Sequence, residues 1–370
     1  MTIGKMFIYV GLAIAATVIL FASQFVLHKK LKWWIALIGF IVKLCLSALF
    51  GALAIAITSP LGWNYSFISV SLYIAFFGDA LADFIGMIVV LARKKPMHVW
   101  LRGGVGLVLT LAFLTFGLIN MQTVTSKEHT YYSEKLDHEY KGVFVSDLHY
   151  GSAQMPETVE KYLKKIKAED PDFFLLGGDI TDEYTTKEEM QKIYEMIGSL
   201  GIPTYFIYGN HDRQPRADKW AKGRTYTDEE LIETIEKNGI TILKDNYVYF
   251  ADDLILMGRE DYSAGDERKK VEELPARPSN VYVINVDHSP YQTEDIVNTK
   301  ADLQLSGHTH DGQYFPLGVG YSLFVKHIFG AFKVGETDLY VSPGICGWHD
   351  PVRTEQRCTY EIIKLCPKKA

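Results

Sequence analysis

Two short stretches decide the fold of this chain, and each joins an apolar run to polar residues. Gly-Val-Phe-Val-Ser-Asp-Leu-His occupies residues 142–149, and Phe-Phe-Leu-Leu-Gly-Gly-Asp-Ile-Thr-Asp occupies residues 173–182. Short apolar runs that end in glycine or polar residues are typical of buried parallel strands. Helical patterns follow at residues 157–168, 187–199 and 227–239. The alternation predicts an α/β domain with a mostly parallel sheet.

The pattern changes after residue 240, where strand-like runs follow one another with few helices between them. We expect strands at residues 247–250, 254–258, 281–285, 303–306, 339–342 and 359–365. These runs predict a second sheet packed on the first, with helices on the outer faces. The apolar run at residues 315–329 favours another core strand, and the alternative is a membrane-facing or acyl-binding rim.

The first third of the chain has a different composition from the rest. Residues 1–121 carry a charge of +7, and the remaining 249 residues carry −13. Four apolar stretches, at residues 6–27, 33–57, 67–92 and 103–121, are each long enough to cross about 30 Å of hydrocarbon. The sequence therefore predicts a four-helix transmembrane bundle at 1–121, a polar linker at 122–140 and an α/β domain at 141–370.

Basic residues in the short connections predict the orientation of these helices. The first and third loops, with the start of the fourth span, contain Lys29, Lys30, Lys32, Arg93, Lys94, Lys95 and Arg102. The second loop, at residues 58–66, has no charge, and Lys5 argues mildly for the opposite orientation. Loops rich in Lys and Arg stay in the cytoplasm. We therefore expect a multi-pass protein of the cell membrane with an extracytoplasmic α/β domain.

Charged residues inside the predicted spans are expected to pair. Lys43 and Asp79 lie equally far from the second loop, so in an antiparallel hairpin they share one depth near the bilayer centre. A charge at that depth is costly unless it is paired. Asp83 lies one turn from Asp79, where Arg102 could reach it. The candidate roles are to specify helix assembly or to form a polar pocket for a headgroup or ion.

Composition excludes other classes of protein. The acidic part has no stripe of Lys or Arg, so we expect no nucleic-acid partner, because phosphate backbones are bound by clustered cations. The four cysteines have no metal-site spacing. Cys358 and Cys366 lie about 26 Å apart in one predicted strand, too far for a disulfide, so buried free thiols are expected.

Polar residues that can bind metal follow five of the predicted strands. They are Asp147 and His149; Asp179 and Asp182; Asn210, His211 and Asp212; His288; and His308 and His310. The carboxyl ends of strands are where α/β sheets place their sites. One such cluster is usually a surface turn, but five in this order indicate a metal site. Oxygen and imidazole donors suit Mn, Fe or Zn.

With these residues the sequence resembles the calcineurin-like binuclear metallophosphoesterases. The shared pattern is Asp-x-His, Gly-Asp-x-x-Asp, Gly-Asn-His-Asp, a later His at a strand end, and Gly-His-x-His, and it extends from residue 142 to the C-terminus. Gly-His-Thr-His-Asp-Gly-Gln at 307–313 and residues 340–353 are similar to the branch of membrane-anchored or exported bacterial phosphoesterases. Asp311 stands where that branch commonly has glycine.

The resemblance implies two divalent or trivalent metal ions and assigns their ligands. One ion would bind Asp147, His149 and His310, the other would bind Asn210, His288 and His308, and Asp179 would bridge them. A hydroxide held between the ions would attack phosphorus, because two cations lower the pKa of a shared water. His211 would stabilise the phosphoryl oxygens or protonate the leaving oxygen, with Asp182 orienting its ring.

Several of these residues have alternative roles. His211 could be only structural, and Asp182 could cap a helix. Arg213 and Arg353 could bind a substrate phosphate through two hydrogen bonds each, or lie on the solvated surface. Local turn capping is expected for two residues near the motifs: Asp212 and His349.

Together these patterns predict a membrane-anchored, two-metal phosphoester hydrolase acting outside the cytoplasm. Lipid-linked or envelope phosphoesters are candidate substrates. One alternative is a cytoplasm-facing hydrolase of nucleotides or nucleotide-sugar lipids, and another is a transporter or sensor with the soluble domain as a regulatory lid. An intact ligand set argues against a degenerate lid. Anchoring requires only one span, so four spans leave room for a second role.

Overall fold

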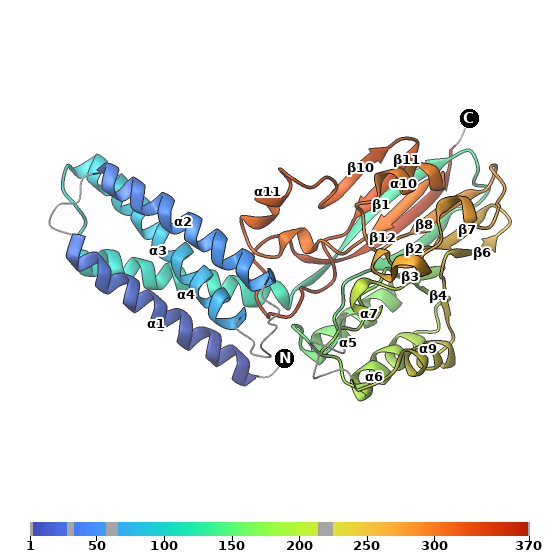
Figure 1. Ribbon diagram of the computed structural model, residues 1–370, viewed down its shortest axis with the longest axis horizontal. Coiled ribbons are helices and arrows are strands. Elements are labelled where there is room, and N and C mark those ends of the chain that lie inside the picture. Colours follow the sequence, from blue (N-terminus) through green and yellow to red (C-terminus); the bar gives the residue numbers. More distant parts are fainter. Residues whose placement is uncertain (1–2, 28–32, 57–65, 214–224, 369–370) are drawn as a thin grey trace. The chain divides into compact units, whose positions relative to one another are not determined.

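The structure is a computed structural model that describes residues 3–27, 33–56, 66–213 and 225–368 (Figure 1). The chain forms two compact units. The first contains residues 1–120 together with 313–319 and 350–355, and the second contains the remaining residues. The basic residues expected in the first loop, Lys29, Lys30 and Lys32, lie outside the described residues.

The second unit contains two sheets of six strands each (Figure 1). The strands of the first sheet, in spatial order, are β1 (Val124–Ser133), β12 (Cys358–Pro367), β2 (Tyr140–Val145), β3 (Phe173–Leu176), β4 (Thr204–Phe206) and β5 (Ile240–Ile242). Strands β2 to β5 are parallel, and β12 is antiparallel to β2. The predicted parallel core is confirmed.

The second sheet has a parallel centre and antiparallel edges. Its strands, in spatial order, are β10 (Gly330–Val334), β11 (Thr337–Val341), β9 (Leu303–Ser306), β8 (Tyr282–Val286), β7 (Leu254–Gly258) and β6 (Asn246–Ala251). Strands β11, β9, β8 and β7 are parallel, whereas β10 and β6 are antiparallel to their neighbours. The predicted second sheet is confirmed.

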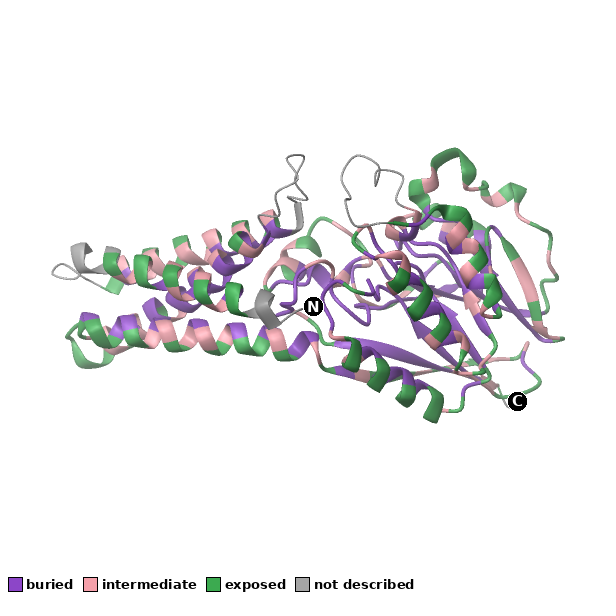
Figure 2. Cartoon of the chain, turned by 90° about the horizontal axis from the view of Figure 1, so that it is seen from below, coloured by how far each residue is buried: buried purple, intermediate pink, exposed green. Residues whose placement is uncertain are grey.

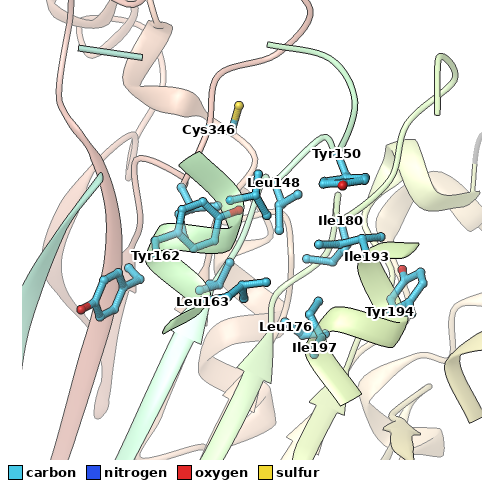
Figure 3. Close-up of a cluster of buried hydrophobic side chains, with 14 of the residues drawn as sticks. Leu148, Tyr150, Tyr162, Leu163, Leu176, Ile180, Ile193, Tyr194, Ile197 and Cys346 are labelled. Atoms are coloured by element: carbon cyan, nitrogen blue, oxygen red, sulfur yellow. The ribbon is translucent and has the colours of Figure 1, made fainter. Parts of the chain in front are cut away.

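Alternating side chains bury both faces of the first sheet. Val143 and Val145 of β2 belong to a core shared with the helices, and Phe144 between them belongs to the core shared with the second sheet. The helices on the outer face are α5 (Pro156–Ala168), α6 (Lys187–Gly198) and α9 (Asp228–Lys237). Figure 3 shows Leu163 of α5 and Ile193 of α6 in this outer core. In Figure 2 the strands are mostly buried and the outward helix faces exposed.

Local signals set the starts of these helices. Thr186 and Glu189 form a capping box at α6, and Thr227 with Glu230 forms the predicted one at α9. The remaining helical segments are short: α7 (Asn210–Arg213), α10 (Thr293–Thr299), α11 (Leu317–Tyr321), η2 (Tyr262–Glu267), η3 (Val271–Glu273) and η4 (His310–Gly312).

Two predicted segments differ in the structure. Residues 122–140, expected as a linker, contain β1, which pairs along all its length with β12. The strand has polar, exposed residues such as Lys127 and Glu128 because it is a sheet edge. The apolar run at 315–329 is not a strand but includes α11, since Pro316 and two glycines, Gly318 and Gly320, disfavour a strand.

The cysteines agree with the expectation of free thiols. All four are free, and β12 contains both Cys358 and Cys366. Cys346 and Cys358 are buried, whereas Cys366 is half-buried and Cys45 is exposed. The expected burial therefore holds for two of them.

The first unit contains the helices α1 (Ile3–Leu27), α2 (Trp33–Ala56), α3 (Ser66–Arg93) and α4, whose last residue Met121 belongs to the other unit (Val99–Met121). Among the described residues, α2, α3 and α4 are long and apolar enough to cross a membrane. The apolar part of α1, residues 7–22, is shorter. Three candidate spans are therefore present, and the four-span bundle stays a prediction.

The predicted ion pair inside the spans is present as part of a larger cluster. Lys43 of α2 contacts Asp79 of α3, and its Nζ lies 2.9 Å from Oδ2 of Asp83. Arg102 of α4 contacts Asp83, as expected. Gly39 leaves room for this cluster, because a Cβ there would lie 2.8 Å from Oδ2 of Asp83. Two cations and two carboxylates thus link three helices.

Replacing Lys43 with methionine should destabilise the protein by about 3–5 kcal/mol, because Asp79 would lose its cation while staying buried. The paired change Lys43→Met with Asp79→Leu should restore most of the loss. Thermal unfolding in detergent measures both, with Lys94→Met as the control at an exposed helix end. Unfolding of the Lys43→Met protein at the wild-type temperature would contradict a structural role for the cluster.

Candidate metal centre

All seven predicted ligands lie just after strand ends, and both sheets contribute. Asp147 and His149 follow β2, Asp179 follows β3, and Asn210 follows β4. From the second sheet, His288 follows β8, and His308 and His310 follow β9. Facing strand ends from two packed sheets therefore supply the donors.

One group of donors consists of Asp147, His149 and His310. The Nε2 atoms of His149 and His310 lie 3.3 Å apart, and Nε2 of His310 lies 3.6 Å from Oδ1 of Asp147. Ligands at about 2.1 Å from a tetrahedral ion lie roughly 3.4 Å from one another. The spacing of these three donors therefore fits one metal ion.

The second group consists of Asp179, His288 and His308, with Asn210 beside them. Nε2 of His288 lies 3.1 Å from Oδ2 of Asp179, and Nδ1 of His308 lies 2.8 Å from Oδ1 of Asn210. The potential ligand atoms of the three titratable residues lie within 4.8 Å of one another. This group also fits one ion, with the Asn210 amide oxygen as a further donor.

Asp179 lies between the two groups. The Oδ2 atom that approaches His288 of the second group also lies 3.8 Å from Nε2 of His149 in the first. A single carboxylate therefore faces donors of both groups, which is the position that a bridging ligand requires. The predicted ligand set is brought together in one place.

Hydrogen bonds to the backbone orient two of the imidazoles. Nδ1 of His288 lies 2.8 Å from the carbonyl oxygen of Gly177, and Nδ1 of His310 lies 3.2 Å from that of Cys346. A carbonyl oxygen can only accept, so Nδ1 carries the proton in both rings and Nε2 keeps its lone pair for a metal ion.

Strained backbone accompanies the ligands. Five of them have positive φ angles: Asp147 (58°), His149 (44°), Asp179 (55°), His308 (74°) and His310 (48°). Each such residue costs about 1 kcal/mol or more, and strain of this kind clusters at functional sites. Gly307 permits the close packing, because a Cβ there would lie 2.3 Å from Oδ2 of Asp147.

Glu183, not Asp182, orients the ring of His211. Nδ1 of His211 lies 2.6 Å from Oε2 of Glu183. The carboxylate of Asp182 instead accepts a hydrogen bond from Ser152 and lies 3.4 Å from Nδ1 of His149, a metal-ligand candidate. The prediction for Asp182 was wrong because sequence spacing cannot tell which of two adjacent acids faces a ring. Asp182 is not a helix cap either, because Thr186 caps α6.

Electrostatic interactions set the charge of the central groups. Burial lowers the pKa of His211, but Asp179 and Glu183 together raise it to about 10. Burial raises the pKa of Asp179, but His288 and His211 hold it well below its usual range. Asp179 is therefore ionised, and His211 can carry a proton.

Asp212 organises the backbone around Asp179. Its carboxylate accepts hydrogen bonds from the backbone N–H groups of Asp179 (2.6 Å), Thr181 (2.9 Å) and Gly209 (3.0 Å). The expected turn-capping role is confirmed, and it joins the loops after β3 and β4. The ring of the other such residue, His349, lies 5.1 Å from that of Tyr184.

The two arginines occupy different settings. Arg213 contacts Glu260 and lies over the ring of Tyr208, 4.1 Å from its centroid. Arg353 is completely buried in the first unit, so the surface alternative is wrong for it. Phosphate binding by either residue stays a prediction.

The sequence did not reveal two neighbours of His211. One is Glu183, whose carboxylate binds Nδ1 of His211 and which lies next to the motif residue Asp182. The other is Trp348, whose ring lies 5.2 Å from the ring of His211. Trp348 lies next to His349 within residues 340–353, the segment that is similar to the bacterial branch. Its place in that segment is the one feature of the sequence that points to a role at the site.

Comparison with known proteins finds a family model and relatives that match the part of the chain that contains this site. Residues 141–312 match the family described as calcineurin-like phosphoesterase. An uncharacterised metallophosphoesterase of Helicobacter pylori strain J99 is 28% identical over 283 residues, 75% of this chain and 73% of its own. A transmembrane protein with metallophosphoesterase domain from Danio rerio is 26% identical over 285 residues, which cover 71% of this chain and 62% of that protein. Phosphodiesterase YaeI of Escherichia coli is 27% identical over 216 residues, which cover 56% of this chain and 75% of that protein.

Replacing Glu183 with glutamine should move the alkaline limb of the pH–rate profile to lower pH. The change removes a negative charge that raises the pKa of His211, so the ring loses its proton at lower pH. Turnover should fall about tenfold, as for loss of an orienting partner, with metal content unchanged. Glu188→Gln, on the exposed face of α6, is the control. An alkaline limb that stays in place would count against the Glu183–His211 pair.

Proposed function

This chain carries a calcineurin-like metallophosphoesterase domain, and on that premise we propose that it is a membrane-anchored phosphoester hydrolase that works with two metal ions. The observation that carries the proposal is the position of Asp179 between two groups of donors. The carboxylate, amide and imidazole donors suit Mn, Fe or Zn.

The side chains divide the work of hydrolysis. Two bound ions would supply charge stabilisation at phosphorus and an activated water. Asp147, His149 and His310 would hold one ion, Asn210, His288 and His308 would hold the second, and Asp179 would be a ligand of both. Glu183 fixes Nδ1 of His211, which leaves Nε2 of that ring to give a proton to the leaving oxygen. The full donor set is also evidence against a degenerate regulatory lid.

Replacing Asp179 with asparagine should abolish most activity, because the amide cannot supply a charged oxygen to both ions. We expect at least a 100-fold loss, since even residues that only orient ligands cost about 10–100-fold. Chelator should inactivate the wild-type protein, and Mn, Fe or Zn should restore it. Turnover of chromogenic phosphoesters and metal content measure the effect, with Asp338→Asn, a half-exposed strand residue, as the control. Wild-type rates with two metals in Asp179→Asn would refute the assignment.

An extracytoplasmic active site is part of the proposal. Arg93 ends the third helix and Lys94 and Lys95 follow it, and all three are exposed. Basic loops stay in the cytoplasm. The fourth helix would then carry the chain outward before β1. A cytoplasm-facing domain acting on nucleotides or nucleotide-sugar lipids is the alternative.

Labelling of introduced cysteines tests the orientation. In a background with both Cys45→Ser and Cys366→Ser, a membrane-impermeant thiol reagent applied to intact cells should label Ser126→Cys, an exposed position of β1, and should spare Lys94→Cys. Lysed cells, in which both positions should react, provide the control. The opposite pattern in intact cells would move the substrate to the cytoplasm.

A lipid-linked substrate is the finer part of the proposal. Leu323 and Phe324 are 77% and 88% exposed, within 14 residues of His310. Adjacent exposed apolar side chains are costly in water and suit contact with an acyl chain or a membrane surface. The orientation proposed above would place envelope phosphoesters within reach.

Replacing both Leu323 and Phe324 with serine should lower turnover of a lipid-linked phosphoester about tenfold, because apolar contact area is lost. Turnover of a small soluble diester should not change, since it makes no such contact. Tyr249→Ser, on β6 at the opposite edge of the sheet from β10, is the exposed aromatic control. Equal losses on both substrates would argue against a lipid-binding surface.

A further inference from the structure

Two segments that adjoin residues of the metal centre in the sequence belong to the first unit. Residues 313–319 begin three residues after the ligand His310, and residues 350–355 begin two residues after Trp348, whose ring approaches His211. Both segments form one compact body with the N-terminal helices. A simple anchor needs no such arrangement, because one apolar helix is enough to retain a domain at a membrane.

The two segments are bonded to each other. The carbonyl oxygen of Gln313 accepts hydrogen bonds from the N–H groups of Thr354 (2.9 Å) and Glu355 (3.2 Å). In return, Oγ1 of Thr354 accepts one from the N–H of Phe315 at 3.0 Å. Hydrogen bonds therefore join the segment that follows His310 to the segment that follows Trp348.

Helix α3 holds these two segments through a buried tyrosine. Tyr73 is completely buried, and its hydroxyl donates to the carbonyl oxygen of Phe315 at 2.8 Å and lies 2.5 Å from Oγ1 of Thr354. One hydroxyl thus contacts both segments at the point where they meet. A buried hydroxyl with partners of this kind fixes position, because leaving those partners unsatisfied is costly.

A second set of contacts surrounds Asp350, which is 2% exposed. Its carboxylate accepts hydrogen bonds from Tyr9 of α1, from Ser66 of α3 at 3.0 Å, and from Tyr314 at 3.2 Å. A buried carboxylate requires several donors, so its position is determined by the helices that supply them.

Helix α4 adds contacts through the backbone. The N–H of Arg353 donates to the carbonyl oxygen of Gly117 at 3.1 Å, and Nδ2 of Asn120 donates to the carbonyl oxygen of Arg353 at 3.1 Å. Gly117 allows this approach, because a Cβ there would lie 2.7 Å from Cγ1 of Val352. Three helices therefore bind the two segments through directed, buried contacts.

We infer that the helices position the active-site segments, so that Tyr73 and Asp350 act as positioning residues for the proposed hydrolysis. The helices fix the segments that continue from His310 and from Trp348, and through the chain they fix the placement of those side chains. The expected effect on kcat rests on the proposed function. The expected effect on the geometry of the metal ligands does not depend on any substrate. It gives the spans a task beyond anchoring.

The test uses Tyr73→Phe in the full-length protein, because this change removes one oxygen and keeps the ring. We expect kcat for a small soluble phosphodiester to fall about five- to tenfold, with KM within about twofold and two metals retained. The visible spectrum of the cobalt-substituted protein should also change, because it reports the geometry of ligands such as His310.

Ser47→Ala is the matched control. Its hydroxyl is also buried and donates to the carbonyl oxygen of Tyr73 itself at 2.9 Å, so this hydrogen bond joins two helices and involves neither segment. The control should keep the wild-type kcat and cobalt spectrum. Unchanged kcat and spectrum in Tyr73→Phe, or equal changes in Ser47→Ala, would overturn the inference.

Thr354→Val provides a second variant if Tyr73→Phe does not fold, because it removes the other half of the same contact. It should reproduce the kinetic and spectral changes, and wild-type behaviour would overturn the inference. If the wild-type protein hydrolyses no phosphoester, the proposed function fails. The cobalt spectra still decide the positioning role in that case, so the two failures are distinguishable.

Discussion

The carboxylate of Asp179 is the feature on which the rest of the site depends. It is buried between imidazoles of both donor groups, and His288 and His211 hold its pKa well below the usual range. The surrounding chain contributes to its placement. The carboxylate of Asp212 accepts hydrogen bonds from the N–H groups of Asp179 and Thr181, and the backbone of Asp179 has a positive φ of 55°. Two sheets must pack correctly before both donor groups can reach it.

Much of this could be predicted from the sequence, because strand ends and metal donors leave strong patterns. The apolar runs that precede Asp147 and Asp179 predicted the parallel strands of the core, and the polar residues after each run predicted the metal ligands. The edge strand β1 was missed because an exposed edge needs no apolar alternation. Glu183 was missed because the choice between neighbouring acids depends on the local path of the chain, which Ser152 and Tyr184 direct by binding Asp182.

The first unit, with its helices α1 to α4, shows the same contrast. The pairing of Lys43 with Asp79 was predictable because hydrocarbon makes an unpaired charge so costly that equal depth alone suggests a partner. The contacts of Tyr73 and Asp350 were not predictable, because tyrosine, serine and threonine are common near helix ends and carry no such penalty. A buried charge has few possible partners, so its partner can be predicted from the sequence. A neutral hydroxyl has many possible partners, so its partner cannot.

The position of β12 has a consequence for biosynthesis. This strand, Cys358–Pro367, lies between β1 and β2, the first two strands of the chain, and pairs with both. The first sheet therefore lacks its strand between β1 and β2 until residues 358–367 have been synthesised, and β1 cannot pair with β12 before then. The complete first sheet can therefore form only after the chain from β1 to β12 has been made.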